Sequence, residues 1–139
     1  MSFLLPNAAK LDTESALING AGFTTAKMRL LASNITIGAS TTLSALLAGE
    51  ASFTGYSAVT LSSWGTPALD GSNRAASLNT QGQFVPTSGG GSGNLYGYFL
   101  TDSGGTHLYG GENFAGAPIT VAQSVTLEID FTYLMDSLF

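Results

Sequence analysis

Residues 125–133 read VTLEIDFTY, and apolar and polar residues alternate along the whole of this stretch. Successive side chains of a β-strand point to opposite faces of a sheet, so strict alternation buries one face and leaves the other in water. The stretch therefore predicts a long strand whose apolar residues face a core: Val125, Leu127, Ile129, Phe131 and Tyr133. Glu128 and Asp130 then lie on the solvent side.

The preceding chain carries further strand patterns. Residues 95–101 (LYGYFLT) and 106–109 (THLY) are joined by Asp102-Ser103-Gly104-Gly105, which predicts a β-hairpin with a four-residue connection. Residues 55–61 alternate, and residues 74–85 form a weaker strand pattern around Gly82. Residues 27–37 (KMRLLASNITI) predict a strand with Met28, Leu30 and Ala32 facing inward, and with a bulge or turn near Ser33-Asn34.

Two short helices interrupt this β pattern. Residues 8–18 follow Asn7, a suitable N-cap, and end before Asn19-Gly20. Residues 41–47 predict one or two helical turns capped by Ser40. The whole chain predicts an all-β fold with one domain over residues 1–139, a β-sandwich of jelly-roll or Greek-key type. Its expected parts are an N-terminal arm or helix (1–22), the sandwich (25–134) and a C-terminal tail (135–139).

The composition is poor in charge. Charged residues make up 9% of the 139 residues, whereas soluble domains average about 25%. Hydrophobic residues make up 44%. So few charges on the surface of a domain indicate either that neutral polar side chains hydrate the surface or that partners cover much of it.

Several classes of function conflict with these residues. The net charge is −5 with four basic residues, so no basic stripe is available for nucleic acid. Cysteine is absent, which excludes disulfides and cysteine-based zinc sites. The start of the chain does not resemble a signal peptide, and no apolar run approaches the roughly 20 residues of a membrane span. We expect no cofactor, no metal and no membrane contact, and a chain made in the cytoplasm.

Two acid-containing groups invite a catalytic interpretation. His107, the one histidine, lies near Asp102, but the chain has no Gly-x-Ser-x-Gly elbow and Asp102 occupies the same turn. Glu128 and Asp130 share a strand face about 7 Å apart, a spacing found in glycoside hydrolases. A solvent-facing position does not supply the desolvation that a catalytic acid needs. We therefore expect a protein that is not an enzyme.

Three blocks carry a family resemblance: residues 5–12 (LPNAAKLD), 53–75 (FTGYSAVTLSSWGTPALDGSNRA) and 94–121 (NLYGYFLTDSGGTHLYGGENFAGAPITV). With the final strand, they resemble small virion structural proteins of tailed bacteriophages over roughly residues 4–134. The most characteristic part is residues 96–114. The resemblance implies a capsid cement or decoration protein, which stabilises a phage head by bridging capsid subunits, and it implies no catalytic residue.

The resemblance implies a location in the virion, on the head surface. The expected partners are the major capsid protein and further copies of the chain, as a dimer or trimer. Apolar residues at the two ends of the chain lie outside the clear core pattern and are the predicted contacts between subunits: Phe3, Leu4, Leu5, Leu134, Met135, Leu138 and Phe139.

An alternative of another class remains open. The chain would then be a tail-tip or fibre module that binds a host surface glycan, since aromatic side chains commonly line such sites. The predicted ligand-binding residues for this alternative are Tyr56, Trp64, Tyr96 and Tyr98, beside the glycine-rich loop at 88–93.

Overall fold

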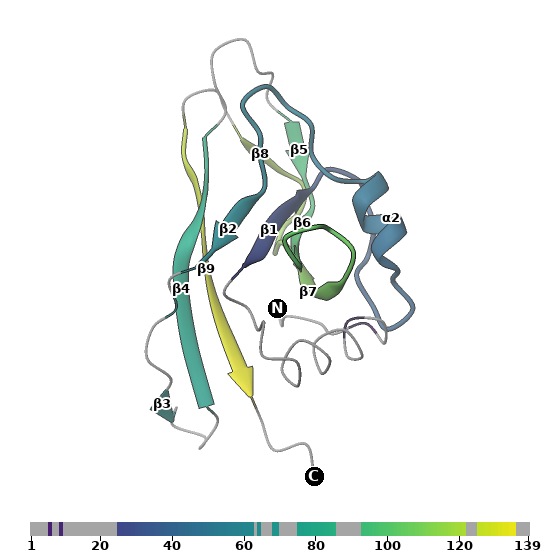
Figure 1. The fold of residues 1–139 in the computed structure, drawn as a ribbon. Coiled ribbons are helices and arrows are strands. Elements are labelled where there is room, and N and C mark those ends of the chain that lie inside the picture. Colours follow the sequence, from purple (N-terminus) through teal and green to yellow (C-terminus); the bar gives the residue numbers. More distant parts are fainter. Residues whose placement is uncertain are drawn as a thin grey trace.

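The computed structural model describes residues 25–62, 75–85, 93–121 and 125–135, together with residues 6, 9, 64, 68 and 69. Apart from one short helix, the elements that these residues form are antiparallel strands, which confirms the all-β prediction (Figure 1). The predicted helix over residues 8–18 lies outside the described residues except for Ala9. The elements are β1 (Ala26–Leu31), α2 (Leu43–Ala48), β2 (Val59–Leu61), β3 (Ala68–Leu69), β4 (Ala75–Phe84), β5 (Gly93–Leu95), β6 (Gly97–Thr101), β7 (Leu108–Asn113), β8 (Ile119–Val121) and β9 (Leu127–Met135).

The first sheet has four strands in the order β2-β1-β6-β7, and all its pairs are antiparallel. It contains the predicted hairpin, as β6 and β7, with the second strand extended to Asn113. The connection spans residues 102–107 and not only 102–105, and Leu95 belongs to β5. The strand predicted over residues 27–37 was too long. β1 ends at Leu31, and Ala32, which we expected to face inward, is exposed.

The second sheet has three strands in the order β3-β4-β9. β9 is the strand predicted from the alternating stretch, with Ile129 and Phe131 buried and Glu128 and Asp130 exposed. The prediction was wrong for Val125, which lies before the strand and is 54% exposed. Between Asn79 and Gly82 the register with β9 shifts, so β4 carries one extra residue there, a β-bulge. Upstream of this bulge, Leu78 pairs with Thr132 and is 45% exposed.

An inner core fills the space between the two sheets. Met28, Leu30 and Leu100 of the four-stranded sheet meet Ile129 and Phe131 of the three-stranded sheet in one apolar cluster. Gly82 permits this close approach, because a Cβ at that position would lie 2.7 Å from the sulfur of Met28. Each fully buried side chain of this size contributes about 1.5–3 kcal/mol to folding.

A second, outer core lies on the opposite face of the four-stranded sheet. Phe99, Leu31 and Leu108 point to that face and are buried with Ile37 and with Leu46 of α2. In Figure 1, α2 lies on the side of the four-stranded sheet away from β4 and β9. The chain therefore has three layers, and β6 is buried on both faces, with all five of its residues inaccessible.

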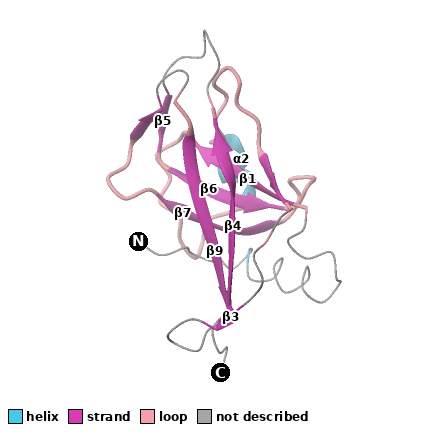
Figure 2. Cartoon of the chain, turned by 90° about the vertical axis from the view of Figure 1, so that its left-hand side faces the viewer, coloured by secondary structure: helices cyan, strands magenta, loops and turns pink. Residues whose placement is uncertain are grey.

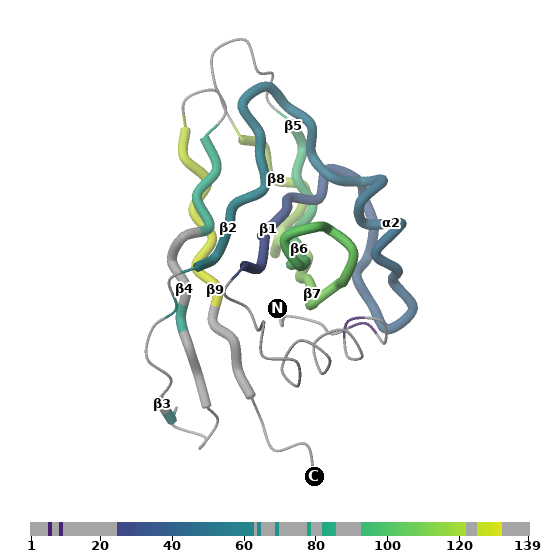
Figure 3. The backbone as a smooth tube through the Cα atoms, in the orientation of Figure 1, coloured from purple at the N-terminus to yellow at the C-terminus, as the bar shows by residue number. Residues whose placement is uncertain are grey.

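Local capping sets the start of α2. The Thr42 side chain accepts a hydrogen bond from the Ala45 amide, so Thr42 is the N-cap and not Ser40 as predicted. From α2 the chain returns over one end of the four-stranded sheet to β2, a course that Figure 3 follows as a tube.

The Asn113 side chain explains why the segment after β1 leaves the sheet. Its amide nitrogen donates to the carbonyl of Ile35 at 2.8 Å, and its amide oxygen accepts from the Ile37 amide at 2.8 Å. This side chain supplies the backbone partners that a neighbouring strand would otherwise give. Ile37 is thereby held in the outer core without being part of a strand.

The three-stranded sheet extends beyond the body of the molecule. Figures 1 and 2 show β4 and β9 side by side, continuing past the four-stranded sheet to β3. The pair β5–β8 lies toward the opposite end of the molecule. The result is a two-stranded arm projecting from the inner core.

Candidate functional site

Two polar networks, two hollows and one turn built around a carboxylate are the features of the described residues that could bind a ligand or take part in a reaction. In the first network, Arg29 of β1 contacts both carboxylate oxygens of Glu50 at 3.1 Å. The same guanidinium donates through Nε to the Thr101 hydroxyl at 3.0 Å. The two charged side chains are 15% and 19% exposed, so the pair is largely shielded from water.

Tyr56 joins this network and extends the edge of the sheet. Its hydroxyl donates to Glu50 Oε1 at 2.7 Å and accepts from the Leu30 amide at 3.1 Å. β2 pairs with β1 only as far as Met28, so the phenol replaces a missing strand carbonyl at Leu30. Burial, followed by the hydrogen bond to Glu50, raises the pKa of Tyr56 above its ordinary value. The group stays a neutral donor and holds residues 50–56 against β1.

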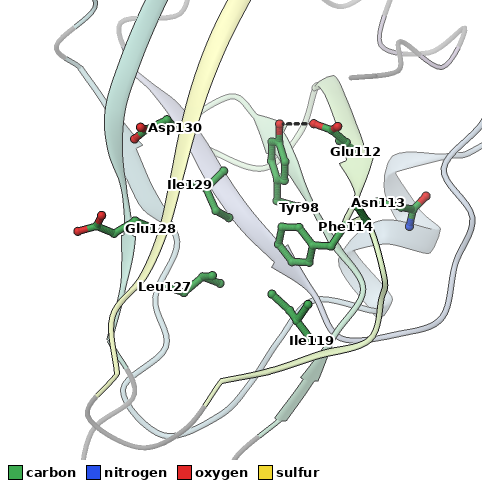
Figure 4. A pocket seen from close by; sticks show the side chains of 10 residues that line it. Tyr98, Glu112, Asn113, Phe114, Ile119, Leu127, Glu128, Ile129 and Asp130 are labelled. Atoms are coloured by element: carbon green, nitrogen blue, oxygen red, sulfur yellow. Dashed lines mark hydrogen bonds between the residues drawn. The ribbon is translucent and has the colours of Figure 1, made fainter. Parts of the chain in front are cut away.

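The second network links β6 to β7 at the rim of the hollow. The Tyr98 hydroxyl donates to Glu112 Oε2 at 2.9 Å (Figure 4). Burial, and then this hydrogen bond, raise the pKa of Tyr98 above its ordinary value. The ring of Tyr98 belongs to the inner core and lies 6.0 Å from the ring of Phe114.

The hollow beside Tyr98 opens between the two sheets, next to β9. Its volume is about 400 Å³, and one wall consists of residues 127–130 of β9. Figure 4 shows Leu127 and Ile129 pointing across the hollow toward Tyr98, Phe114 and Ile119. Its walls are thus mainly apolar and aromatic.

Two of the carboxylates beside the hollow face outward. Figure 4 shows Glu128 and Asp130 pointing to the far side of β9, away from Tyr98. Both side chains are exposed, and neither makes an ion pair with another described residue. In register with Glu128 on β4 lies the neutral Gln83. The acids lie where the sequence places them, on the wet face of the strand.

A second hollow lies at the end of the molecule near β5. Its volume is about 480 Å³, and it is lined by Phe53 and Tyr96 together with the polar side chains of Ser52 and Asn94. Aromatic rings beside hydroxyl and amide groups suit a polyhydroxylated ligand.

His107 lies in the turn between β6 and β7, which is held together by hydrogen bonds to the Asp102 carboxylate. Asp102 Oδ1 accepts from the backbone amides of Thr106 at 2.6 Å and His107 at 2.9 Å, while Oδ2 accepts from the Thr106 hydroxyl at 2.7 Å. His107 Nδ1 lies 3.4 Å from the same carboxylate, and its side chain is 54% exposed. The carboxylate organises a turn, as expected of an Asx motif.

These hydrogen bonds make the turn sensitive to acid. Burial acts to raise the pKa of Asp102, but the hydrogen bonds from Thr106 and His107 outweigh it and leave the pKa well below its ordinary range. A carboxylate with a depressed folded-state pKa stabilises the fold above its unfolded pKa of about 3.9, and this contribution disappears as the pH falls through the folded-state pKa.

We expect Asp102→Asn to lower the free energy of unfolding by about 1 kcal/mol at neutral pH. The difference from the wild type should shrink as the pH falls below about 4, because the unfolded wild-type chain then takes up a proton that folded Asp102 binds only at lower pH. Urea unfolding of both proteins between neutral pH and strong acid measures this. A difference that stays constant over that range would contradict the assignment.

The predicted ligand-binding aromatics do not gather on one open face. Tyr98 is buried, and Tyr56 and Trp64 pack partly buried against the same inner core. Tyr56 stacks on Phe84, and the Trp64 indole donates to the Leu61 carbonyl at 3.1 Å. Tyr96 lines the second hollow, apart from the other three.

The predicted contacts between subunits lie mostly beyond the described residues. Phe3, Leu4, Leu5, Leu138 and Phe139 fall outside them. Leu134 and Met135 are the last residues of β9 and pair with Ala76 and Ala75 of β4. They therefore belong to the projecting arm, and Met135 continues the strand by one residue into the predicted tail.

Comparison with protein-family models, with curated proteins and with solved structures found no match to this chain. Within the described ranges, no three histidine or acidic side chains are grouped so that they could hold a metal ion. Among those same residues, no helix has both the length and the apolar character to cross a membrane.

Sequence reasoning missed the polar networks. Arg29 and Glu50 are 21 positions apart, and Asn113 and Ile37 are 76 positions apart. No local spacing signals such pairs. The one available hint was the scarcity of charge: an arginine within an apolar strand needs a carboxylate nearby.

Proposed function

We propose that this chain is a structural protein of a tailed-phage virion, a capsid cement or decoration protein that stabilises the head by bridging capsid subunits. Its partners are the major capsid protein and further copies of itself, as a dimer or trimer. It acts on the head surface without catalysis, and its sheets follow a jelly-roll or Greek-key connectivity. Support comes from the family resemblance of the sequence and from the distribution of exposed apolar residues.

The distribution of exposed apolar side chains carries this proposal. Leu69 of β3 is 70% exposed and Leu78 of β4 is 45% exposed. Val85 and Val125 flank β4 and β9 and are 46% and 54% exposed. Leu69 and Leu78 belong to the sheet that projects from the body (Figure 2), whereas Val85 and Val125 lie beside the opposite ends of β4 and β9. Contiguous exposed apolar surface commonly marks a protein contact.

The mechanism is burial of that surface against neighbouring subunits. Each contact gains roughly 25 cal/mol per Å² of apolar surface removed from water. A symmetric lattice repeats the contact, so that a modest affinity at each site becomes firm attachment through multivalency. The proposed additional contacts are the apolar residues at the ends of the chain: Phe3, Leu4, Leu5, Leu134, Met135, Leu138 and Phe139.

Binding to purified phage shells tests the proposal. We expect the wild-type chain to saturate shells at a copy number comparable with that of the major capsid protein. Leu69→Ser with Leu78→Ser should weaken attachment strongly. Thr60→Ser, at an exposed position of β2 away from the arm, serves as the control and should attach normally. A dozen or fewer copies per particle, or no attachment, would refute the cement function.

The second hollow favours the alternative function, glycan binding by a tail-tip or fibre module. Phe53, Tyr96, Ser52 and Asn94 together offer the aromatic and polar groups that sugars use. Under this alternative, Tyr96→Ala abolishes binding on a glycan array, whereas Trp64→Ala, which alters a ring outside the hollow, spares it. An array without any bound glycan would refute the alternative.

A further inference from the structure

β9 has a free edge along its length within the described part of the chain. It pairs with β4 on one side, and it is the last strand in the order β3-β4-β9. A free edge presents backbone N–H and C=O groups that can accept another strand. Here the free edge also borders the hollow of about 400 Å³ that opens between the sheets.

The two faces of β9 differ in chemistry at this edge. On the inner side, Leu127 and Ile129 contribute apolar walls opposite Tyr98, Phe114 and Ile119 (Figure 4). On the outer side, Glu128 and Asp130 are exposed and without a cationic partner among the described residues. A strand added beside β9 would alternate between these two environments.

We propose that this edge receives an extended segment of a partner protein in which apolar and basic residues alternate. The apolar side chains of the segment enter the hollow and cover Phe114, Ile119 and Ile129. Its lysine or arginine side chains lie on the outer face, across from Glu128 and Asp130, where cross-strand pairs of opposite charge are favourable. The backbone of the segment pairs with β9 and extends the three-stranded sheet.

A second copy of this chain does not fit this position. Pairing two β9 strands would bring the Glu128 and Asp130 side chains of both copies onto the same sheet face, which like charges disfavour. The stretch of this chain in which basic and apolar residues alternate is Lys27-Met28-Arg29-Leu30. That stretch lies in β1, which pairs with β2 on one side and with β6 on the other. The segment therefore comes from a different protein.

The proposal rests on the proposed function only for the identity of that partner as a shell protein. The chemistry of the segment follows from β9 and the hollow. The two ideas are separable, because attachment to shells is measured on particles and occupancy of the edge is measured on the isolated full chain.

A short synthetic peptide in which lysine and valine alternate is the probe, titrated into the full chain and followed by amide NMR. We expect shifts confined to residues 127–131 and 112–119. A peptide of the same composition with its lysines and valines in separate blocks should bind at least several-fold more weakly. Methylation of alternate peptide nitrogens should also weaken binding, because it removes donors to the strand edge.

Matched charge variants complete the test. Glu128→Gln and Asp130→Asn should each weaken binding about threefold to fivefold. Thr60→Lys on β2 makes the same change in net charge away from the edge and should leave binding unaltered. Equal binding of the alternating and block peptides, or equal losses in Glu128→Gln and Thr60→Lys, would overturn the proposal. Shell attachment together with no peptide binding would also overturn it and leave the proposed function intact.

Discussion

Phe99→Ala should lower the free energy of unfolding by about 3–5 kcal/mol, the cost of emptying a fully packed aromatic site. Phe99 is completely buried on the face of β6 that looks away from the other sheet. Its neighbours Ile37 and Leu46 come from the segment after β1 and from α2. The adjacent Gly111 leaves no spare room, since a Cβ there would lie 3.2 Å from the Cβ of Phe99.

This experiment also tests which chain covers the ring. If the outer core belongs to the same chain, Phe99→Ala loses the same stability relative to the wild type at every protein concentration. A loss of unfolding free energy that appears only in concentrated protein would mean that a second subunit covers this face. Leu108→Ala and Leu78→Ala form a matched pair: Leu108 is fully buried and should cost about 2–5 kcal/mol. Leu78 is exposed and should cost about 0.5 kcal/mol.

Glu50→Ala should lower the free energy of unfolding by about 2–3 kcal/mol, more than a surface ion pair contributes. The substitution leaves the Arg29 guanidinium, 15% exposed, without its carboxylate. It also removes the acceptor of the Tyr56 hydroxyl, which holds residues 50–56 to β1. The loss of one member of a shielded pair is costly because the other charge stays away from water.

A double-mutant cycle separates the ion pair from the rest of the network. With Arg29→Met in the background, Glu50→Ala should cost clearly less, because no unpaired guanidinium remains. Tyr56→Phe keeps the ring stacked on Phe84 and should cost about 1 kcal/mol for the lost hydroxyl contacts. Chemical denaturation of the wild type, the two single variants of Arg29 and Glu50 and their double variant gives the coupling energy. Additive effects would mean that Arg29 and Glu50 do not stabilise each other.

Local pattern predicted the strands whose residues alternate. β9 follows its sequence closely, as does the β6–β7 hairpin, because each has an apolar face and the hairpin has a glycine-rich turn. The end of β1 could not be predicted from the alternation of apolar and polar residues. Residues 35–37 carry apolar side chains at strand spacing, but Asn113 from the far end of the chain takes their backbone partners.

The candidate site could not be predicted because its residues come from different strands, and the spacing of residues along the sequence does not reveal which strands lie opposite one another. Leu127 and Ile129 were predicted to face a core, and they do, but the strand that would cover their outer edge is not among the described residues. The hollow arises because Tyr98 and Phe114 come from other strands opposite that edge. The aromatic residues were easy to single out in the sequence. Which of them pack in the core, line a hollow or join a polar network depends on the fold.

The bulge in β4 lies at the base of the projecting arm. β4 has one extra residue between Asn79 and Gly82, and Leu78 lies opposite Thr132, on the outer side of the sheet. Asn79 pairs with Phe131 and Gly82 with Ile129, so deleting that single residue would leave the same spacing on both strands and keep Leu78 opposite Thr132. Loss of the extra residue would therefore remove the local distortion of β4 at the base of the arm, while the arm and the core kept the faces that they have now.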